Sequence, residues 1–119
     1  NTTTSRPKNL LDAKQGEPGG LSGAPLFELS TQKLAQTFLA AKQRIPIIGV
    51  GGVDSAETAY TKVKAGASLI QLYTALIYKG PRLFSEINKG LSEALKNDNI
   101  DHISDAVGIE ADYWAAKEV

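Results

Sequence analysis

The hydrophobic positions of the chain alternate between short apolar runs and longer stretches with helical spacing. The run 45–50 is apolar, rich in β-branched residues and too short for a helix. It predicts a strand buried on both faces of a parallel sheet, with Pro46 at the strand entrance. A second run, 67–72, predicts another such strand, which Tyr73 and Thr74 complete. We therefore expect two parallel strands joined through a helix.

Helical spacing occurs before, between and after these two strands. The segment 25–43 predicts an amphipathic helix that begins at Pro25, with Ser30 as a candidate break. Between the strands, Asp54 and Glu57 have the spacing of a capping box, which predicts a helix start. After the second strand, Pro81 predicts the start of another helix, and its apolar stripe is Phe84, Ile87, Leu91 and Leu95.

The two ends of the chain have weaker patterns. Residues 1–4 read as the end of a strand, and the long loop that follows is a candidate lid or ligand loop, because long loops in compact domains are usually functional or disordered. The segment 101–108 predicts a turn or a short helix, which Tyr113 and Trp114 are expected to pack down.

The order strand, helix, strand, helix predicts an α/β fold with right-handed crossovers. A complete (β/α)₈ barrel takes about 250 residues and rarely fewer than 200. The 119 residues therefore predict either a small open sheet or the end of a barrel. The first four residues resemble neither a signal peptide nor a Met-initiated terminus, so we expect a chain cut from something longer.

Composition and charge narrow the classes of function. The chain is 42% hydrophobic and 22% charged, which is typical of a globular domain and excludes a disordered tail. Thirteen Lys and Arg balance thirteen Asp and Glu, so no global field attracts nucleic acid or an anionic bilayer. There is no cysteine and only one histidine, His102, which excludes a thiolate or multi-histidine metal site. No apolar run reaches the roughly 18 to 20 residues that span a bilayer.

The strongest chemical signal is the sequence GVGG at 49–52, at the end of a predicted strand and directly before a helix. Glycines there let main-chain N–H groups approach an anion, and the helix adds the positive end of its dipole. Tyr73 and Thr74 leave the next strand, and (β/α)₈ enzymes often bind phosphate at the loops after strands 7 and 8. Together, the glycines at 49–52 and the residues Tyr73 and Thr74 predict a phosphate cradle. Alternatively, the glycines only relieve crowding at a tight turn.

A further glycine-rich sequence, GGLSG at 19–23, contains Ser22 and Gly23 and precedes Pro25. It is either another anion-binding nest or a flexible hinge. No nucleophile elbow, P-loop or zinc-protease motif occurs, and nothing supplies a general base, so no catalytic residue is assigned. Three basic side chains near these loops are expected to be solvated charges: Arg6, Lys14 and Lys79.

Four motifs in one order resemble the C-terminal part of the dihydroorotate dehydrogenases, which are flavin-dependent (β/α)₈ enzymes of pyrimidine synthesis. They are NTT at 1–3, GGLSGAPL at 19–26, PIIGVGGV at 46–53 and AGASLIQLYT at 65–74. Within that family, the class 2 members are membrane-associated and quinone-linked. They are favoured by YTAL at 73–76, KGP at 79–81 and ISDAVG at 103–108.

The resemblance implies that residues 1–119 are the C-terminal part of an FMN-binding barrel domain, comprising its last strand–helix units. It implies that Asn1 and Thr2 hydrogen-bond the ring of orotate or dihydroorotate. The residues implied to hold FMN are Gly23, Gly52, Tyr73 and Thr74, with Ser22 and Gly51 beside them and Gly51 sharing the phosphate cradle.

The resemblance also implies a reaction, in which dihydroorotate is oxidised to orotate by proton loss to a serine and hydride transfer to FMN, and electrons pass to ubiquinone. The family's serine base and flavin-proximal lysine lie outside these residues, so the chain alone is not expected to be active. Expected partners are the substrate, ubiquinone and the remainder of the barrel, without nucleic acid. Membrane association, at the mitochondrial inner membrane, would come only through a missing N-terminal segment.

Two other hypotheses stay open on the residues alone. One is the phosphate-binding half of a different (β/α)₈ biosynthetic enzyme, because such enzymes use the same two terminal loops. The other is a non-catalytic folding or assembly unit, which would expose strand edges and an apolar sheet face. A soluble, cooperative monomer would instead favour a small independent α/β domain.

Overall fold

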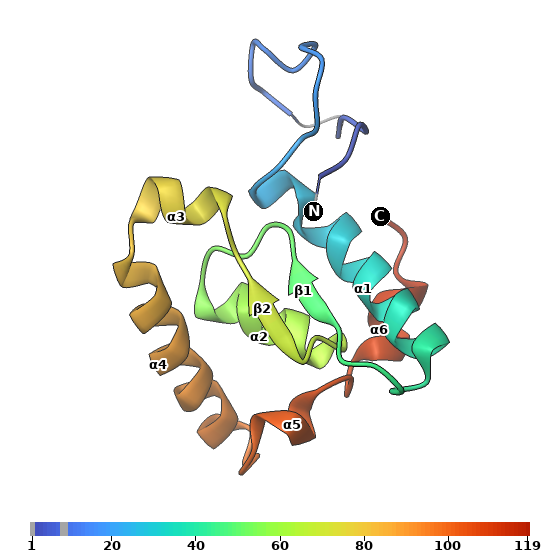
Figure 1. The fold of residues 1–119 in the computed structure, drawn as a ribbon, viewed down its shortest axis with the longest axis vertical. Coiled ribbons are helices and arrows are strands. Elements are labelled where there is room, and N and C mark those ends of the chain that lie inside the picture. Colours follow the sequence, from blue (N-terminus) through green and yellow to red (C-terminus); the bar gives the residue numbers. More distant parts are fainter. Residues whose placement is uncertain (1, 8–9) are drawn as a thin grey trace.

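A computed structural model of the chain describes residues 2–7 and 10–119. It is a mixed structure of helices and two strands, arranged as Figure 1 shows. In chain order the elements are the 3₁₀ helix η1 (Ala24–Leu26), α1 (Phe27–Ala41), β1 (Ile48–Val50), α2 (Ala56–Lys64), β2 (Leu69–Gln71), α3 (Thr74–Lys79), α4 (Arg82–Asn97), α5 (Ile103–Ala106) and α6 (Ala111–Ala116).

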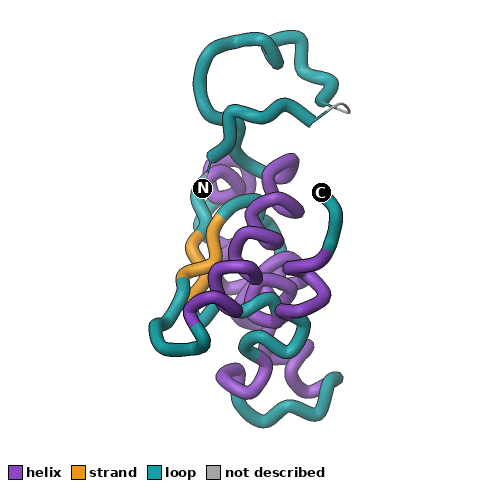
Figure 2. The backbone as a smooth tube through the Cα atoms, turned by 90° about the vertical axis from the view of Figure 1, so that its right-hand side faces the viewer, coloured by secondary structure: helices purple, strands orange, loops and turns teal. Residues whose placement is uncertain are grey.

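Strands β1 and β2 pair in parallel, as the sequence predicted. In the middle pair, Gly49 is opposite Ile70, and Ile70 packs against all three hydrophobic clusters under the helices. Because side chains alternate along a strand, the flanking pair of Ile48 and Leu69 points to the other face. Figure 2 shows helices on one side of the strands only. The prediction of strands buried on both faces is therefore wrong for this chain, since Ile48 is 51% and Leu69 62% exposed.

Helix α1 follows η1 directly, so the helical prediction for 25–43 is largely confirmed. The candidate break at Ser30 does not occur. The hydroxyls of Ser30 and Thr31 both donate to the carbonyl of Phe27, at 3.0 and 2.6 Å, within a continuous helix. Hydroxyls that bond back to the preceding turn are compatible with helix, and for this reason the polar pair leaves α1 intact.

Helix α2 begins with a capping box, but one residue later than the sequence predicted. Ser55 has extended backbone angles and its hydroxyl accepts from the Thr58 N–H at 3.2 Å. The Thr58 hydroxyl oxygen in turn accepts from the Ser55 N–H at 3.0 Å. The box is therefore formed by Ser55 and Thr58 and not by Asp54 and Glu57, because Ser55 takes the N-cap position.

The helices at the C-terminal end of the chain differ from the sequence prediction at two points. In α4 the buried positions are Leu83 and Ile87, whereas Phe84 is 48% exposed, because it lies one position away from the face that 83 and 87 share. The predicted short helix in 101–108 is confirmed as α5, but α6 had no sequence signal. Trp114 on α6 is buried with its ring edge against Phe27, while Tyr113 is exposed.

Candidate functional site

The carboxyl ends of β1 and β2 point to the side of the molecule where α3 and the N-terminal segment lie (Figure 1). A cavity of about 350 Å³ opens there. Seven of the eight residues assigned from the sequence line it, namely Thr2, Ser22, Gly23, Gly51, Gly52, Tyr73 and Thr74. The eighth, Asn1, lies outside the described residues. Segments up to 72 positions apart are thus brought to one site.

The loop after β1 needs glycine at two successive positions. Gly51 has φ +103° and Gly52 has φ +74°, a region that other residues rarely adopt. A Cβ on Gly52 would lie 2.6 Å from Cα of Phe27, and one on Gly51 would lie 2.8 Å from Oγ of Ser30. The first turn of α1 therefore packs directly under this loop. The explanation that these glycines only ease a tight turn does not account for that close packing.

The loop before η1 closes the cavity from a second side. A Cβ on Gly23 would lie 3.2 Å from Cγ2 of Thr74, which puts the loop containing 22–23 against the start of α3. Thr2 reaches the same place, because a Cβ on Gly20 would lie 2.8 Å from its Oγ1. The segments before α1, after β1 and after β2 meet at this cavity.

Main-chain N–H groups without protein partners occur at two of these segments. Among the described residues, neither the Gly52 nor the Thr74 N–H donates a hydrogen bond. Unpaired donors at glycine loops and helix starts are the groups that bind phosphate and other anions. The cavity thus has the chemistry that an anionic ligand requires.

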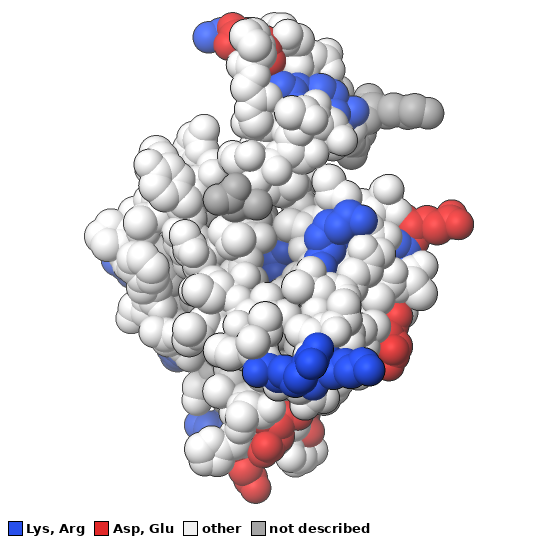
Figure 3. Space-filling view, turned by 45° about the vertical axis from the view of Figure 1, so that its right-hand side comes forward, with Lys and Arg blue, Asp and Glu red and all other residues white. Residues whose placement is uncertain are grey.

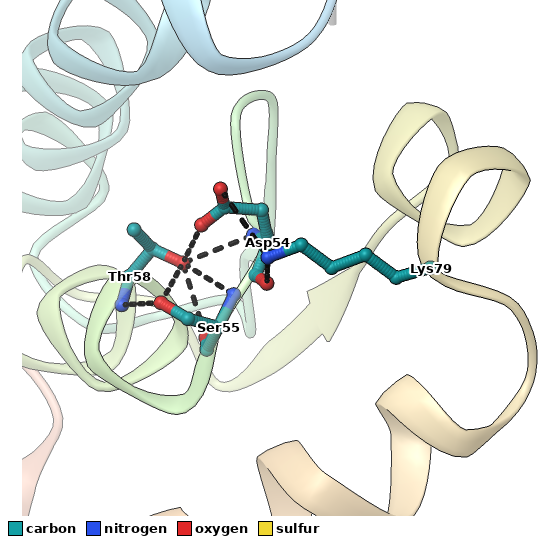
Figure 4. Close-up of polar contacts among 4 residues, drawn as sticks. All are labelled: Asp54, Ser55, Thr58 and Lys79. Atoms are coloured by element: carbon teal, nitrogen blue, oxygen red, sulfur yellow. Dashed lines mark hydrogen bonds and ion pairs between the residues drawn. The ribbon is translucent and has the colours of Figure 1, made fainter.

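One ion pair lies at the rim of this cavity, between the start of α2 and the end of α3 (Figure 4). The Lys79 Nζ donates to the carbonyl oxygen of Asp54 at 2.7 Å and lies 3.7 Å from its carboxylate Oδ2. The same carboxylate accepts from the Thr58 hydroxyl at 3.2 Å. Lys79 is exposed, as expected of a solvated charge, and in addition it joins the end of α3 to Asp54, directly before α2.

Arg6 is a basic residue whose prediction as a solvated charge the structure corrects. Its guanidinium donates to the carbonyl oxygens of Gln15 and Gly19, both at 2.9 Å, and of Glu17 at 3.1 Å. It also donates to carbonyls within 3–5, and Thr3 forms an antiparallel bridge with Leu21. Arg6 thus holds the N-terminal loop together from inside. Sequence spacing could not reveal this role, because the partners are backbone oxygens.

We expect replacement of Arg6 by alanine to loosen this loop. Amide hydrogen exchange in peptides covering 3–21 should accelerate about tenfold, because several backbone carbonyls lose their shared donor. Arg6→Lys should not restore protection, since an ammonium lacks the planar fork of five donors. Lys14→Ala, at an exposed position of the same loop, is the matched control. Unchanged exchange in Arg6→Ala would contradict the assigned role.

A buried lysine behind the glycine loop had no sequence signal. Lys62 on α2 is 0% exposed, and its Nζ donates to Ser30 Oγ at 2.6 Å. Burial lowers the pKa of Lys62 to about 7. Within residues 2–7 and 10–119, no acidic side chain forms an ion pair with it. Lysine is almost never fully buried without a charged partner, so this position needs an explanation.

Neither sign of charge covers the whole of the face shown in Figure 3. Positive and negative side chains both occur on the face in Figure 3, and much of it is uncharged. Within the part of the chain that the structure describes, no cluster of His, Cys, Asp and Glu could hold a metal ion. Nor is any helix in that part long and apolar enough to cross a membrane.

Comparison with known proteins gives matches along nearly the whole chain. A model of the family described as dihydroorotate dehydrogenase matches residues 1–95. The dihydroorotate dehydrogenase (quinone) of Allorhizobium ampelinum is 52% identical over 120 aligned residues, which cover 100% of this chain and 33% of that protein. The protein of the same name from Halobacterium salinarum is 50% identical over 110 residues, covering 92% and 31% respectively.

The fold is also shared with solved structures. Ligand-free DHODH from Eimeria tenella superimposes with a TM-score of 0.89 at 34% sequence identity, over 92% of this chain and 31% of that one. Its complex with ferulenol gives a TM-score of 0.88. The chain spans about a third of the length of the curated relatives it matches. It belongs to the dihydroorotate dehydrogenase family, within the quinone-type branch.

Proposed function

We propose that this chain forms the C-terminal part of an FMN-dependent (β/α)₈ enzyme that oxidises dihydroorotate to orotate and passes the electrons to a quinone. Its own share would be to hold the FMN phosphate and to contact part of the substrate. The observation that carries the proposal is the convergence of Gly52 and Thr74, each with an unpaired main-chain N–H, on one cavity at the carboxyl ends of paired parallel strands. In (β/α)₈ enzymes this end of the barrel carries the active site.

The residues present fit the phosphate of a flavin nucleotide. The N–H groups of Gly52 and Thr74 would donate to its oxygens, and the absence of a Cβ at 51–52 leaves the main chain open to approach. Gly23 and Tyr73 would contact the rest of the cofactor, with Ser22 beside them. When bound, FMN supplies the hydride-accepting chemistry that no side chain has. The chain's own residues bind and orient it.

Substrate contact would come from the N-terminal segment. Thr2 lines the same cavity as the glycine loop, so a ring bound beside the flavin would lie within reach of its hydroxyl. The corresponding role of Asn1 stays a prediction. Because no catalytic acid or base is assigned here, the chain would orient substrate while other parts of the enzyme move the proton.

The uncovered face of the sheet supports the barrel assignment. Ile48 and Leu69 are half exposed on the side away from the helices. In a closed barrel that face is filled by layers of branched side chains from all eight strands. We therefore propose that further strands of the same enzyme cover it, and that residues 1–119 form part of one barrel domain. Membership of the family leaves no separate support for a different phosphate-binding barrel enzyme.

The test uses the full-length protein that carries this chain, purified and stripped of flavin. We expect FMN to bind with at least tenfold higher affinity than riboflavin, which has the same ring but no phosphate, because the N–H donors at 51–52 and 73–74 act on the phosphate. The reconstituted protein should reduce a short-chain ubiquinone only when dihydroorotate is added. Equal affinity for FMN and riboflavin would contradict the proposal. Location at the mitochondrial inner membrane stays a prediction, which fractionation would test.

A further inference from the structure

The buried Lys62 lies directly behind the glycine loop that lines the cavity. Its Nζ is 2.6 Å from Ser30 Oγ, 3.5 Å from the carbonyl oxygen of Phe27 and 5.1 Å from the centre of the Phe27 ring. Its Cβ packs near Gly49, where an added Cβ would lie 3.3 Å away. Lys62 therefore links α2 to the first turn of α1 and to β1, underneath the loop at 51–52.

Ser30 carries this link to the loop itself. Its Oγ is 3.0 Å from the carbonyl oxygen of Gly51 and also 3.0 Å from that of Phe27. A serine hydroxyl has one hydrogen to donate and can accept from other donors. Because the Lys62 ammonium donates to Oγ, the hydroxyl hydrogen is left for the two carbonyls. The result is a chain of hydrogen bonds, in which Lys62 donates to Ser30 and Ser30 donates to the carbonyl oxygen of Gly51.

We infer that Lys62, acting through Ser30, is a positioning residue that orients the peptide groups at 51–52 for an anionic ligand. The inference rests on the proposed function, because the ligand it concerns is the FMN phosphate. Fixing the Gly51 carbonyl toward Ser30 directs the following N–H, that of Gly52, away from the protein interior, since carbonyl and N–H of one peptide unit point in opposite directions. The Gly52 N–H, like that of Thr74, donates no hydrogen bond among the described residues.

The surroundings of Lys62 argue against a general structural role. A buried ammonium costs several kcal/mol unless a charge compensates it, and an apolar side chain of similar length would avoid that cost. The groups that contact its Nζ are one hydroxyl, one carbonyl and one aromatic face, and no carboxylate is among them. A residue that lowers the stability of the folded protein is expected to contribute to another property, such as ligand binding.

The test compares variants of the full-length protein for binding of FMN and of riboflavin, by titration of the flavin-free form. Lys62→Met keeps an unbranched side chain, one heavy atom shorter and without the donor, and Ser30→Ala removes the link. Each should weaken FMN about tenfold or more while riboflavin affinity changes less than about twofold. The double variant should lose no more than the worse single one, because both act along one chain. Lys89→Met, on the exposed face of α4, is the matched control.

The outcomes separate this inference from the function it rests on. If the unaltered protein does not prefer FMN to riboflavin, the proposed function fails. If it does, and both Lys62→Met and Ser30→Ala keep that preference, the positioning role is overturned. Equal loss of FMN and riboflavin in both variants would also overturn it, because a general disturbance of the site would not single out the phosphate. Ser30→Ala answers the question even if Lys62→Met does not fold.

Discussion

Gly52→Ala is expected to weaken FMN binding at least a hundredfold in the full-length protein. An added Cβ would lie 2.6 Å from both Cα and Cβ of Phe27 and 2.8 Å from its N. The Cα and N are backbone atoms of a helix and the Cβ is fixed to them, so none can swing aside as the end of a flexible side chain can. The loop would therefore have to move, and with it the N–H groups that are proposed to hold the phosphate. Fluorescence titration of the flavin-free protein measures the effect.

Gly80→Ala is the control for the backbone component of this substitution. Gly80 has the same φ of +74° as Gly52, yet an added Cβ would meet nothing within 4 Å. Both variants have the cost of placing alanine at a positive φ, on the order of 1 to 3 kcal/mol, and only Gly52→Ala has the overlap with Phe27. We expect Gly80→Ala to bind FMN as the unaltered protein does. Similar loss in both variants, or normal binding by Gly52→Ala, would show that close packing at 52 does not shape the site.

The second large effect concerns the stability of Lys62→Met. At pH 6 we expect this variant to have a higher thermal midpoint than the unaltered protein when both are free of flavin. Burial lowers the pKa of Lys62 from 10.5 to about 7, so at pH 6 the folded protein holds a desolvated ammonium that methionine does not have. The full effect of such a pKa difference is on the order of several kcal/mol.

The pH dependence of this difference has a defined sign. Between pH 7 and 10.5 the unfolded chain keeps a proton on Lys62 that the folded chain releases, so stability of the unaltered protein rises with pH relative to the variant. The advantage of Lys62→Met should therefore shrink steadily from pH 7 to pH 10. Thermal melts at pH 6, 8 and 10 test this, with Lys89→Met as the control. An advantage that is constant with pH would mean that the folded chain keeps the proton on Lys62, so that burial does not lower its pKa.

Much of the fold could be predicted from the sequence because its signals are local. The β-branched runs at 45–50 and 67–72 contain the two observed strands, and the prolines at 25 and 81 lie at helix starts. Element ends were harder to place. The capping box moved from Asp54 to Ser55, since either residue can cap and only the backbone angles decide. Helix α6 gave no signal, because it is held by a contact between Phe27 and Trp114, which lie far apart in the sequence.

The candidate site could be assigned in part for the same reason. Parallel strands bring their carboxyl ends to one edge, so the glycines after β1 and the Tyr73–Thr74 pair after β2 had to meet. The supporting side chains could not be found this way. In the sequence, Lys62 cannot be distinguished from a surface lysine on an amphipathic helix. Arg6 donates only to backbone oxygens. Their roles follow from tertiary contacts that leave no spacing pattern.

The central claim is that the loops at 51–52 and 73–74 bind one phosphate group together. A crystal structure of the full-length protein with FMN tests this most directly. We expect the phosphate to lie between the two loops, accepting hydrogen bonds from the N–H groups of Gly52 and Thr74. A flavin whose phosphate lies elsewhere, with those two N–H groups facing solvent or protein, would contradict the account.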